Sequence, residues 1–446
     1  MTNTNKMATM PMNKLLFDMS LPIVISMVAS ALYNIIDSVF VSHYSKTAFD
    51  AVSLCYPIQQ ILVAVAVGTA LSIQALLARS LGENNKDKAQ QVLCHGLLMS
   101  AIHSLLFLVA GLFFAEKFMM FFTSDAELIA QGAIYFRICT IFGFGINIQI
   151  AFERVMQATG NAIYNLYIQA VGAIINCILD PILIFGLVGE PMGIKGAAIA
   201  TVVGQMVAMA IGIILTIYKV KEVNLSFKNF KFDKELFKQM YEIAIPAICM
   251  SSIMSIATVF INKILSVYSS SATTAFGVYF KLYQFLCMAI NGISNAVIAI
   301  ISFNYGARLK NRIRECIKLT LISSCVIMII GMIIFLLFPN TLLSMFNPDQ
   351  EMHDIAIVAM RICSLSFIGS AINIQVCSFL QALDGSKQSL FLSLLRQLII
   401  LIPLAYLLSL TKGLNALWWS FPISETLVAL LSFRLLIQIN HKIENI

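Results

Sequence analysis

The chain has 446 residues, of which 59% are apolar and only 11% are charged, and its net charge is +7. Because an ordinary soluble domain carries about 25% charged residues, this composition excludes a soluble globular protein and indicates a chain solvated mainly by lipid. The positive charge does not indicate nucleic-acid binding, since most aromatic residues lie inside apolar runs and not among Lys and Arg residues.

Twelve apolar segments follow one another along the chain, each long enough to cross a hydrocarbon core of about 30 Å. Only helices satisfy all backbone polar groups over such lengths, so the predicted fold class is an all-α polytopic membrane protein. The first segment begins at Leu15 and is too long for a cleavable signal peptide, so we expect it to remain in the membrane. The predicted spans are residues 15–42, 52–80, 91–114, 127–158, 163–188, 193–218, 239–268, 275–306, 315–338, 351–382, 387–410 and 413–439.

The distribution of Lys and Arg predicts the orientation of these spans. The termini and the even-numbered connections carry 20 of the basic residues, with Arg154 counted in the cytoplasmic connection after the fourth span, and the odd-numbered connections carry four. Cytoplasmic segments hold the basic excess in membrane proteins, so we expect both termini in the cytoplasm. Topology thereby explains the net charge.

The chain also contains an internal repeat. A shift of 224 residues places Pro22 on Pro246 and Gly82 on Gly306, and the matches continue to Gln157-Ala158 on Gln381-Ala382. We therefore expect twelve helices in two pseudo-symmetric six-helix lobes around a central cleft, a construction that alternating-access transporters use. A pseudo-symmetric channel and a duplication that only stabilises the bundle are the alternatives. The predicted division is an N-lobe at 1–218, a cytoplasmic linker at 219–238 and a C-lobe at 239–446.

Three acidic residues, Asp37, Asp180 and Glu425, fall well inside predicted spans. A charged side chain at the bilayer centre costs at least about 2.5–3.5 kcal/mol, so such residues usually face a cavity or a partner. Asp37 and Asp180 each end a stripe of polar residues at helical spacing. The stripes are Ser26, Ser30, Tyr33, Asn34 and Asp37 in the first span, and Asn165, Gln169, Asn176 and Asp180 in the fifth.

Oxygen-rich stripes of this kind suit Na⁺ or a proton, because carboxylate, amide and hydroxyl oxygens can replace the water around a hard cation. The alternative is that Asp37 and Asp180 pair with basic residues of other spans. The Cys and His residues form no CxxC pair and no cluster, so we expect no cofactor, and no metal other than Na⁺. The candidate basic partners are Arg137, Arg361, Arg396, Lys263 and Lys281.

The second half repeats the first stripe without its acid, because Ile261 takes the place of Asp37. Its polar residues are candidates either for a substrate cleft or for hydrogen bonds between helices, each worth about 0.6–2 kcal/mol. The candidate cleft residues of both halves are Asn34, Gln169, Asn262, Lys281, Gln284, Asn291 and Glu425.

Several motifs together resemble the multidrug and toxic compound extrusion (MATE) family, above all its bacterial members, over nearly the whole chain. These are Leu21-Pro22 with Leu32 to Asp37, Ser80-Leu81-Gly82, Gln157 to Gly160, Asn176 to Pro181, and Gly196 to Thr201.

The resemblance implies two six-helix lobes that form a V-shaped cleft, and export of cationic, amphipathic drugs driven by inward Na⁺ or H⁺ flow. By motif position, Asp37, Asn176, Asp180 and Thr201 correspond to the family's cation-binding and protonation group, with Tyr33 beside Asp37. The polar stripes select all of these except Thr201. The same carboxylates serve either ion, so the sequence does not distinguish Na⁺ from H⁺.

We therefore expect a multidrug antiporter of the bacterial inner membrane that acts as a monomer, with drugs, organic cations and membrane lipid as its partners. A flippase for lipid-linked oligosaccharides is the alternative, which Lys263, Lys281 and Arg396 keep open. An enzyme is not expected, because no nucleophile with a nearby base appears at a shared depth and the sequence has no Walker A motif.

Overall fold

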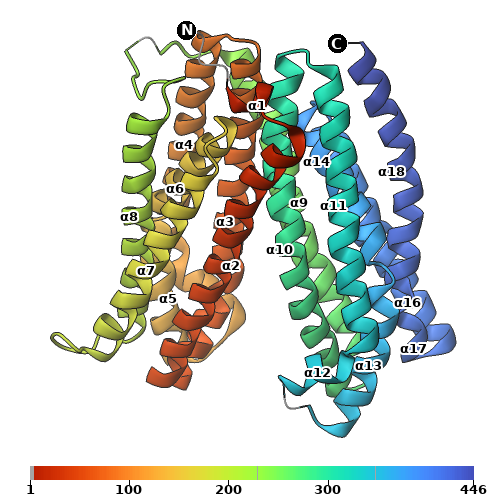
Figure 1. Cartoon of the computed structure of the whole chain (residues 1–446). Helices are drawn as coiled ribbons and strands as arrows, with labels where there is room; N and C mark the ends of the chain where they lie inside the picture. Colours follow the sequence, from red (N-terminus) through yellow and green to blue (C-terminus); the bar gives the residue numbers. More distant parts are fainter. Residues whose placement is uncertain (1–4, 229, 347, 446) are drawn as a thin grey trace. The chain divides into compact units, whose positions relative to one another are not determined.

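The structure is a computed structural model that describes residues 5–228, 230–346 and 348–445. All regular elements in these residues are helical, and ten helices are long and apolar enough to cross a membrane. Two bent helix pairs raise the number of candidate spans to twelve when each pair is taken as one span. The predicted all-α polytopic fold class is confirmed (Figure 1).

Each bent pair coincides with a segment that the sequence predicts as a single span, residues 127–158 and 351–382. The two helices of the first pair, α5 and α6, meet at 44°, and those of the second, α13 and α14, meet at 52°. Gly143 lies at the first bend, where a Cβ would come within 2.9 Å of Leu62 Cδ1. The same Cβ would lie 3.1 Å from the carbonyl oxygen of Thr140, so the bend is closely packed around this residue.

The contacts divide the chain into two compact units. Of the described residues, unit 1 contains Asn5 and those from 21 to 248, and unit 2 contains those from 6 to 20 and from 249 to 445. This division differs from the expected one at both borders, because residues 6–20 belong to the second unit and residues 219–248 to the first.

Unit 1 contains most of α2 and the helices from α3 to α8, together with the first part of α9. The bounds are α2 Met12–Tyr44, α3 Lys46–Gly82, α4 Lys86–Phe122, α5 Ala126–Ile141, α6 Phe144–Ala158, α7 Ile163–Phe185, α8 Ile194–Lys219 and α9 Lys234–Leu265.

Unit 2 contains α1, the start of α2, the rest of α9 and all later helices. A π-helical segment, Leu395–Ile400, interrupts its eleventh predicted span. The bounds are α1 Lys6–Thr9, α10 Ser270–Gly306, α11 Lys310–Leu337, α12 Pro339–Ser344, α13 Gln350–Ser364, α14 Phe367–Ala382, α15 Ser386–Leu394, α16 Leu401–Lys412, α17 Leu414–Leu417 and α18 Ser420–Glu444.

The repeated residues perform the same local tasks in both units. Ser45 caps α3 by accepting a hydrogen bond from the N–H of Ala48, and Ser269 caps α10 by accepting one from Ala272. Asp125 and Asp349 cap α5 and α13 in the same way. Part of the sequence repeat is therefore explained by helix capping.

Helices α2 and α9 each contribute to both units and carry an interior proline beside the border between them. Pro22 lies next to the border in α2, and Pro246 lies next to it in α9. Proline in a helix interior removes one backbone hydrogen bond and favours a bend. The N-terminal segment joins unit 2 because Arg312 donates hydrogen bonds to the backbone carbonyls of Met7 and Met10, at 2.9 and 2.8 Å.

The linker between the two repeats packs on α4 within unit 1. Gln90 accepts a hydrogen bond from the backbone N–H of Asn224 at 2.9 Å, and His95 Nε2 accepts one from that of Asp233 at 2.9 Å. The His95 ring also contacts the rings of Phe230 and Phe232. These contacts explain why the predicted linker is part of unit 1.

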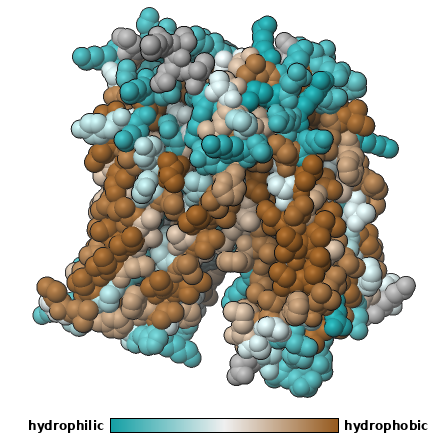
Figure 2. Space-filling model, in the orientation of Figure 1, coloured by the Kyte–Doolittle hydropathy of each residue, from teal (hydrophilic) through white to brown (hydrophobic). Residues whose placement is uncertain are grey.

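The sides of both units are predominantly hydrophobic along the middle of the helices, and hydrophilic residues gather toward the helix ends (Figure 2). Large apolar side chains on α4 are widely exposed, with Phe113 at 69% and Phe121 at 84%. Contact of this apolar surface with water would be unfavourable in free energy, whereas hydrocarbon solvates it. The exposed surface therefore fits a lipid environment.

Candidate functional site

Unit 1 encloses a cavity of about 340 Å³, which we call the unit 1 cavity. This volume lies within the range of about 300–1,000 Å³ that ligand pockets occupy. Five of the predicted site residues line it. They are Tyr33, Asn34 and Asp37 on α2, Gln169 on α7 and Thr201 on α8.

The two predicted acids meet beside this cavity. Asp37 on α2 and Asp180 on α7 lie within hydrogen-bonding reach of each other, and Asp180 is fully buried. Asn176 Nδ2 donates to Asp180 Oδ1 at 3.4 Å. The structure therefore brings the ends of the two polar stripes together.

Three oxygens of this group, Asp37 Oδ1, Asn176 Oδ1 and Asp180 Oδ2, are buried and have no hydrogen-bond partner among the described residues. A buried polar atom without a partner costs about 1–3 kcal/mol, and more when it is charged. A proton or a cation among these oxygens would remove that cost. Their arrangement is therefore suited to binding a small positive charge.

The basic residues that could neutralise the acid pair lie elsewhere. Within the described parts of the chain, neither Asp37 nor Asp180 forms an ion pair with Lys or Arg. Arg137 instead pairs with the exposed Glu116, at 3.1 Å. Permanent pairing with an intramembrane basic residue is thus not observed for either acid.

Close packing of α7 against α8 positions Asn176 near Thr201. The helices approach at Gly172 and Gly204, and a Cβ on Gly204 would lie 2.8 Å from the carbonyl oxygen of Gly172. Small residues allow such close approach of membrane helices. A side pocket of about 20 Å³ lies at this contact, lined by Tyr33, Gln149, Gln169, Gly172, Ala173, Asn176, Thr201, Gly204 and Gln205.

A further acid, Glu153 on α6, is linked to the unit 1 cavity through amides. Gln149 Nε2 donates to Glu153 Oε1 at 3.0 Å and to Gln169 Oε1 at 2.6 Å. Gln149 and Gln169 both line the cavity. Gln149 is not among the site residues predicted from the sequence. Its spacing of four residues from Glu153 nevertheless indicates that both side chains share one helix face.

Arg154 was expected in a cytoplasmic connection, and this prediction is wrong. Its side chain is buried within α6, with only 8% of the residue exposed. It donates to Gln74 at 3.2 Å and to Gln157 at 3.0 Å, and Gln157 in turn donates to Asn165. Buried amides replace water around this cation.

The candidate residues of the second half lie in unit 2. Lys281, Gln284 and Asn291 on α10 are exposed and line none of the three cavities described for the two units. Asn262 on α9 is half-buried, and its Oδ1 has no hydrogen-bond partner among the described residues. Glu425 lines the third of these cavities, which lies in unit 2.

The model of the MatE family matches residues 22–182 and 246–407. The multidrug export protein MepA of Staphylococcus haemolyticus is 25% identical over 431 residues, which cover 96% of this chain and 94% of that protein. MepA of Staphylococcus aureus is 25% identical over 94% of this chain and 92% of its own length.

Solved structures share the fold. An outward-facing multidrug resistance MATE transporter of the MOP superfamily superposes with a TM-score of 0.92 at 21% identity, over 100% of this chain and 99% of that one. A MOP superfamily transporter from Pyrococcus furiosus gives a TM-score of 0.90 at 20% identity, over 99% and 98% of the two chains.

Proposed function

The chain belongs to the MatE family of MATE transporters. We propose that it exports cationic, amphipathic drugs in exchange for Na⁺ or H⁺. It is a multi-pass membrane protein of a transporter family and not of an enzyme family. The relatives named as multidrug export proteins support drugs as its substrates.

The observation that carries the proposal is the acid pair beside the unit 1 cavity. The cavity is large enough for part of a drug molecule, and Asp37 lines it directly. The oxygens of Asp37, Asn176 and Asp180 that lack hydrogen-bond partners could bind the coupling ion beside the same cavity. Drug and ion would therefore compete for one negatively charged region.

Competition of this kind couples the two flows. An organic cation is attracted while the pair carries negative charge, and loading of a proton or Na⁺ removes that attraction in a medium of low dielectric constant. Since each ligand weakens binding of the other, the two occupy the protein in turn. Alternation between the two loaded states gives antiport.

Dye efflux from proteoliposomes with independently imposed Na⁺ and H⁺ gradients tests this proposal. Ethidium efflux should follow one of the two gradients in the wild-type protein and should be lost in Asp37→Asn. Glu116→Gln is the matched control, because it removes an exposed carboxylate of α4 that does not line the cavity. Efflux that follows neither gradient would exclude antiport.

We also propose that both termini lie in the cytoplasm and that the chain acts as a monomer in the bacterial inner membrane. The excess of basic residues in the terminal segments and even-numbered connections supports the orientation. The unit 1 cavity is lined by one unit of one chain, so it needs no second copy. Protease accessibility of a C-terminal tag in sealed inverted vesicles tests the orientation.

A further inference from the structure

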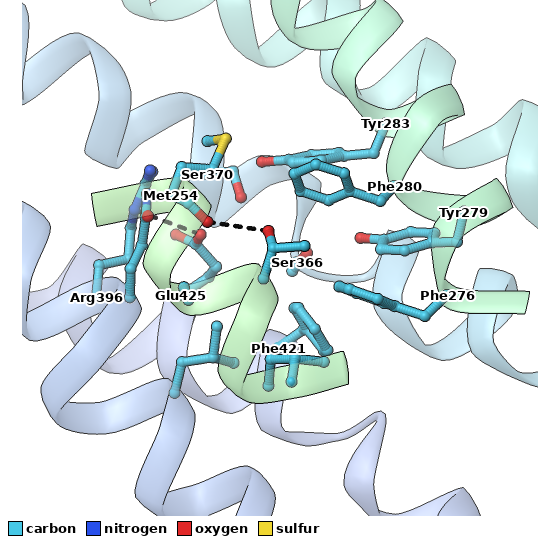
Figure 3. Close-up of a pocket in the computed structure, with 15 residues that line it drawn as sticks. Met254, Phe276, Tyr279, Phe280, Tyr283, Ser366, Ser370, Arg396, Phe421 and Glu425 are labelled. Carbon is cyan, nitrogen blue, oxygen red and sulfur yellow. Dashed lines mark hydrogen bonds and ion pairs between the residues drawn. The ribbon is translucent and has the colours of Figure 1, made fainter. Parts of the chain in front are cut away.

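A second pocket lies within unit 2 and is separate from the acid pair of unit 1. It has a volume of about 60 Å³, and we call it the unit 2 pocket. Aromatic rings from α10 and α18 line one side of it, and Arg396 and Glu425 line the opposite side (Figure 3). The rings belong to Phe276, Tyr279, Phe280, Tyr283 and Phe421.

Arg396 is the unusual member of this pocket. Only 8% of the residue is exposed, yet Nε and Nη1 have no hydrogen-bond partner among the described residues. Its contact with Glu425 joins Nε and Oε1 at 3.7 Å, which is too long for a hydrogen bond. The N–H groups at Nε and Nη1 of the buried guanidinium group are therefore available to a hydrogen-bond acceptor.

Glu425 is already held by another group. Its Oε2 accepts a hydrogen bond from Asn373 Nδ2 at 2.7 Å, and Asn373 Oδ1 accepts one from Ser432 at 2.7 Å. This network fixes the carboxylate on the side of the pocket formed by α14 and α18. Ser370 Oγ and Gln397 Oε1, which also line the pocket, have no hydrogen-bond partner among the described residues either, but the charged group whose atoms lack partners is Arg396 and not Glu425.

The π-helical segment places Arg396 and the next residue, Gln397, on the same pocket, although consecutive residues of an α-helix point about 100° apart. Ser424 donates a hydrogen bond to the backbone carbonyl of Arg396 at 2.7 Å, which supports the segment from α18. Such π-helical turns occur frequently at functional sites. Two adjacent polar side chains thus face the aromatic rings.

We propose that the unit 2 pocket binds the carboxylate group of an aromatic amphipathic substrate, so that zwitterionic compounds are bound in addition to simple cations. Arg forms charge-assisted hydrogen bonds with carboxylates through its planar fork. The rings that line the pocket can pack against the part of the substrate next to the carboxylate. The volume holds a group the size of a carboxylate, because one water-sized probe needs about 10–15 Å³. The proposal rests on the proposed drug export but not on the coupling ion.

Two dyes that differ only at the carboxylate test the proposal. Rhodamine 110 carries a free carboxylate and rhodamine 123 is its methyl ester, with the same ring system. Equilibrium binding is measured by fluorescence anisotropy on the full chain in lipid nanodiscs without an ion gradient. The wild-type protein should bind rhodamine 110 more tightly, and Arg396→Gln should weaken its binding by about tenfold or more. Binding of rhodamine 123 should change by less than about twofold.

Further variants separate this role from a structural one. Arg396→Lys keeps the charge but loses the fork, so it should retain part of the preference for rhodamine 110. Glu425→Gln removes the competing acid and should strengthen rhodamine 110 binding. Arg137→Gln, at an exposed intramembrane Arg, should leave the ratio of the two dissociation constants unchanged.

Several outcomes would overturn the proposal. Equal affinity for the two dyes, or an equal loss for both in Arg396→Gln, would exclude carboxylate recognition. Weaker binding of rhodamine 123 in Glu425→Gln would show that the pocket binds cations. Ethidium efflux measured on the same preparations separates the two proposals, because normal efflux without dye discrimination contradicts only the pocket. Dye discrimination without gradient-driven efflux contradicts only the antiport.

Discussion

The carboxyl groups of Asp37 and Asp180 lie within hydrogen-bonding reach of each other, although they belong to α2 and α7. Two carboxyl groups share a hydrogen bond only when one of them carries a proton, because an ionised carboxylate has no donor. The pair therefore acts as one unit in which the charge state of each group depends on the other.

This coupling predicts how substitutions of the two acids combine. We expect Asp37→Asn and Asp180→Asn each to reduce ethidium efflux by about 100-fold or more, and the double variant to be no worse than either single variant, since residues that act as a unit are not additive. Initial efflux rates in proteoliposomes measure this. Losses that multiply in the double variant would show that the two acids act independently.

Gly204→Ala should damage the site through helix packing. The new Cβ would meet the backbone of Gly172 at 2.8 Å, which forces α7 and α8 apart and moves Asn176 away from Thr201. We expect a loss of about 1–3 kcal/mol in stability and a clear fall in efflux. Thermal denaturation in detergent, followed by size-exclusion chromatography, measures the stability.

Gly277→Ala is the matched control for this packing prediction. A Cβ at Gly277, on α10, has no heavy atom within 4 Å. Alanine is favoured over glycine in a helix by about 1 kcal/mol, so this variant should keep or slightly raise the melting temperature. A drop equal to that of Gly204→Ala would contradict the packing explanation.

Arg154 should be more important for folding than its predicted loop position suggests. Arg154→Met leaves the buried Gln74 and Gln157 without their cationic donor, and we expect a loss of about 2–4 kcal/mol. Arg137→Gln, which breaks an exposed ion pair, should cost less than about 1 kcal/mol. Melting temperatures of the two variants, compared in one detergent, decide between these values.

The contact between the linker and α4 predicts a change in proteolysis. His95→Phe keeps the ring packing against Phe230 and Phe232 but removes the acceptor for the backbone N–H of Asp233. We expect trypsin to cleave the linker several times faster, since cleavage follows local opening. Gln350→Ala, at an exposed position of unit 2, should leave the rate unchanged. An unaltered rate in His95→Phe would show that the hydrogen bond does not hold the linker.

The sequence predicts the all-helical class and the polar stripes because hydrophobic length and helical spacing are local properties. Asp37 and Tyr33 do line a cavity, as their stripe indicates. Spacing defines a helix face but not the neighbour of that face, so it could not distinguish these residues from Lys281 and Gln284, which are exposed.

Other features depend on tertiary packing and could not be read from spacing. Thr201 faces the unit 1 cavity because glycines bring α7 and α8 together, and only the family resemblance selects it in the sequence. The sorting of basic residues places Arg154 with the connection after the fourth span because it considers charge alone and ignores buried amide partners. The position of Arg396 in the unit 2 pocket depends on a π-helical segment that the hydrophobic pattern does not indicate.

The sharing of α2 and α9 between the units has a consequence for biosynthesis. Neither repeat encodes a complete unit, since residues 6–20 are made before unit 1 but pack with unit 2, and residues up to 248 are needed to complete unit 1. On the ribosome, unit 1 cannot finish packing until α9 has been synthesised. The segment that contains Met7 and Met10 must likewise wait for Arg312, its hydrogen-bond donor, so it is anchored only after all of unit 1 has been synthesised.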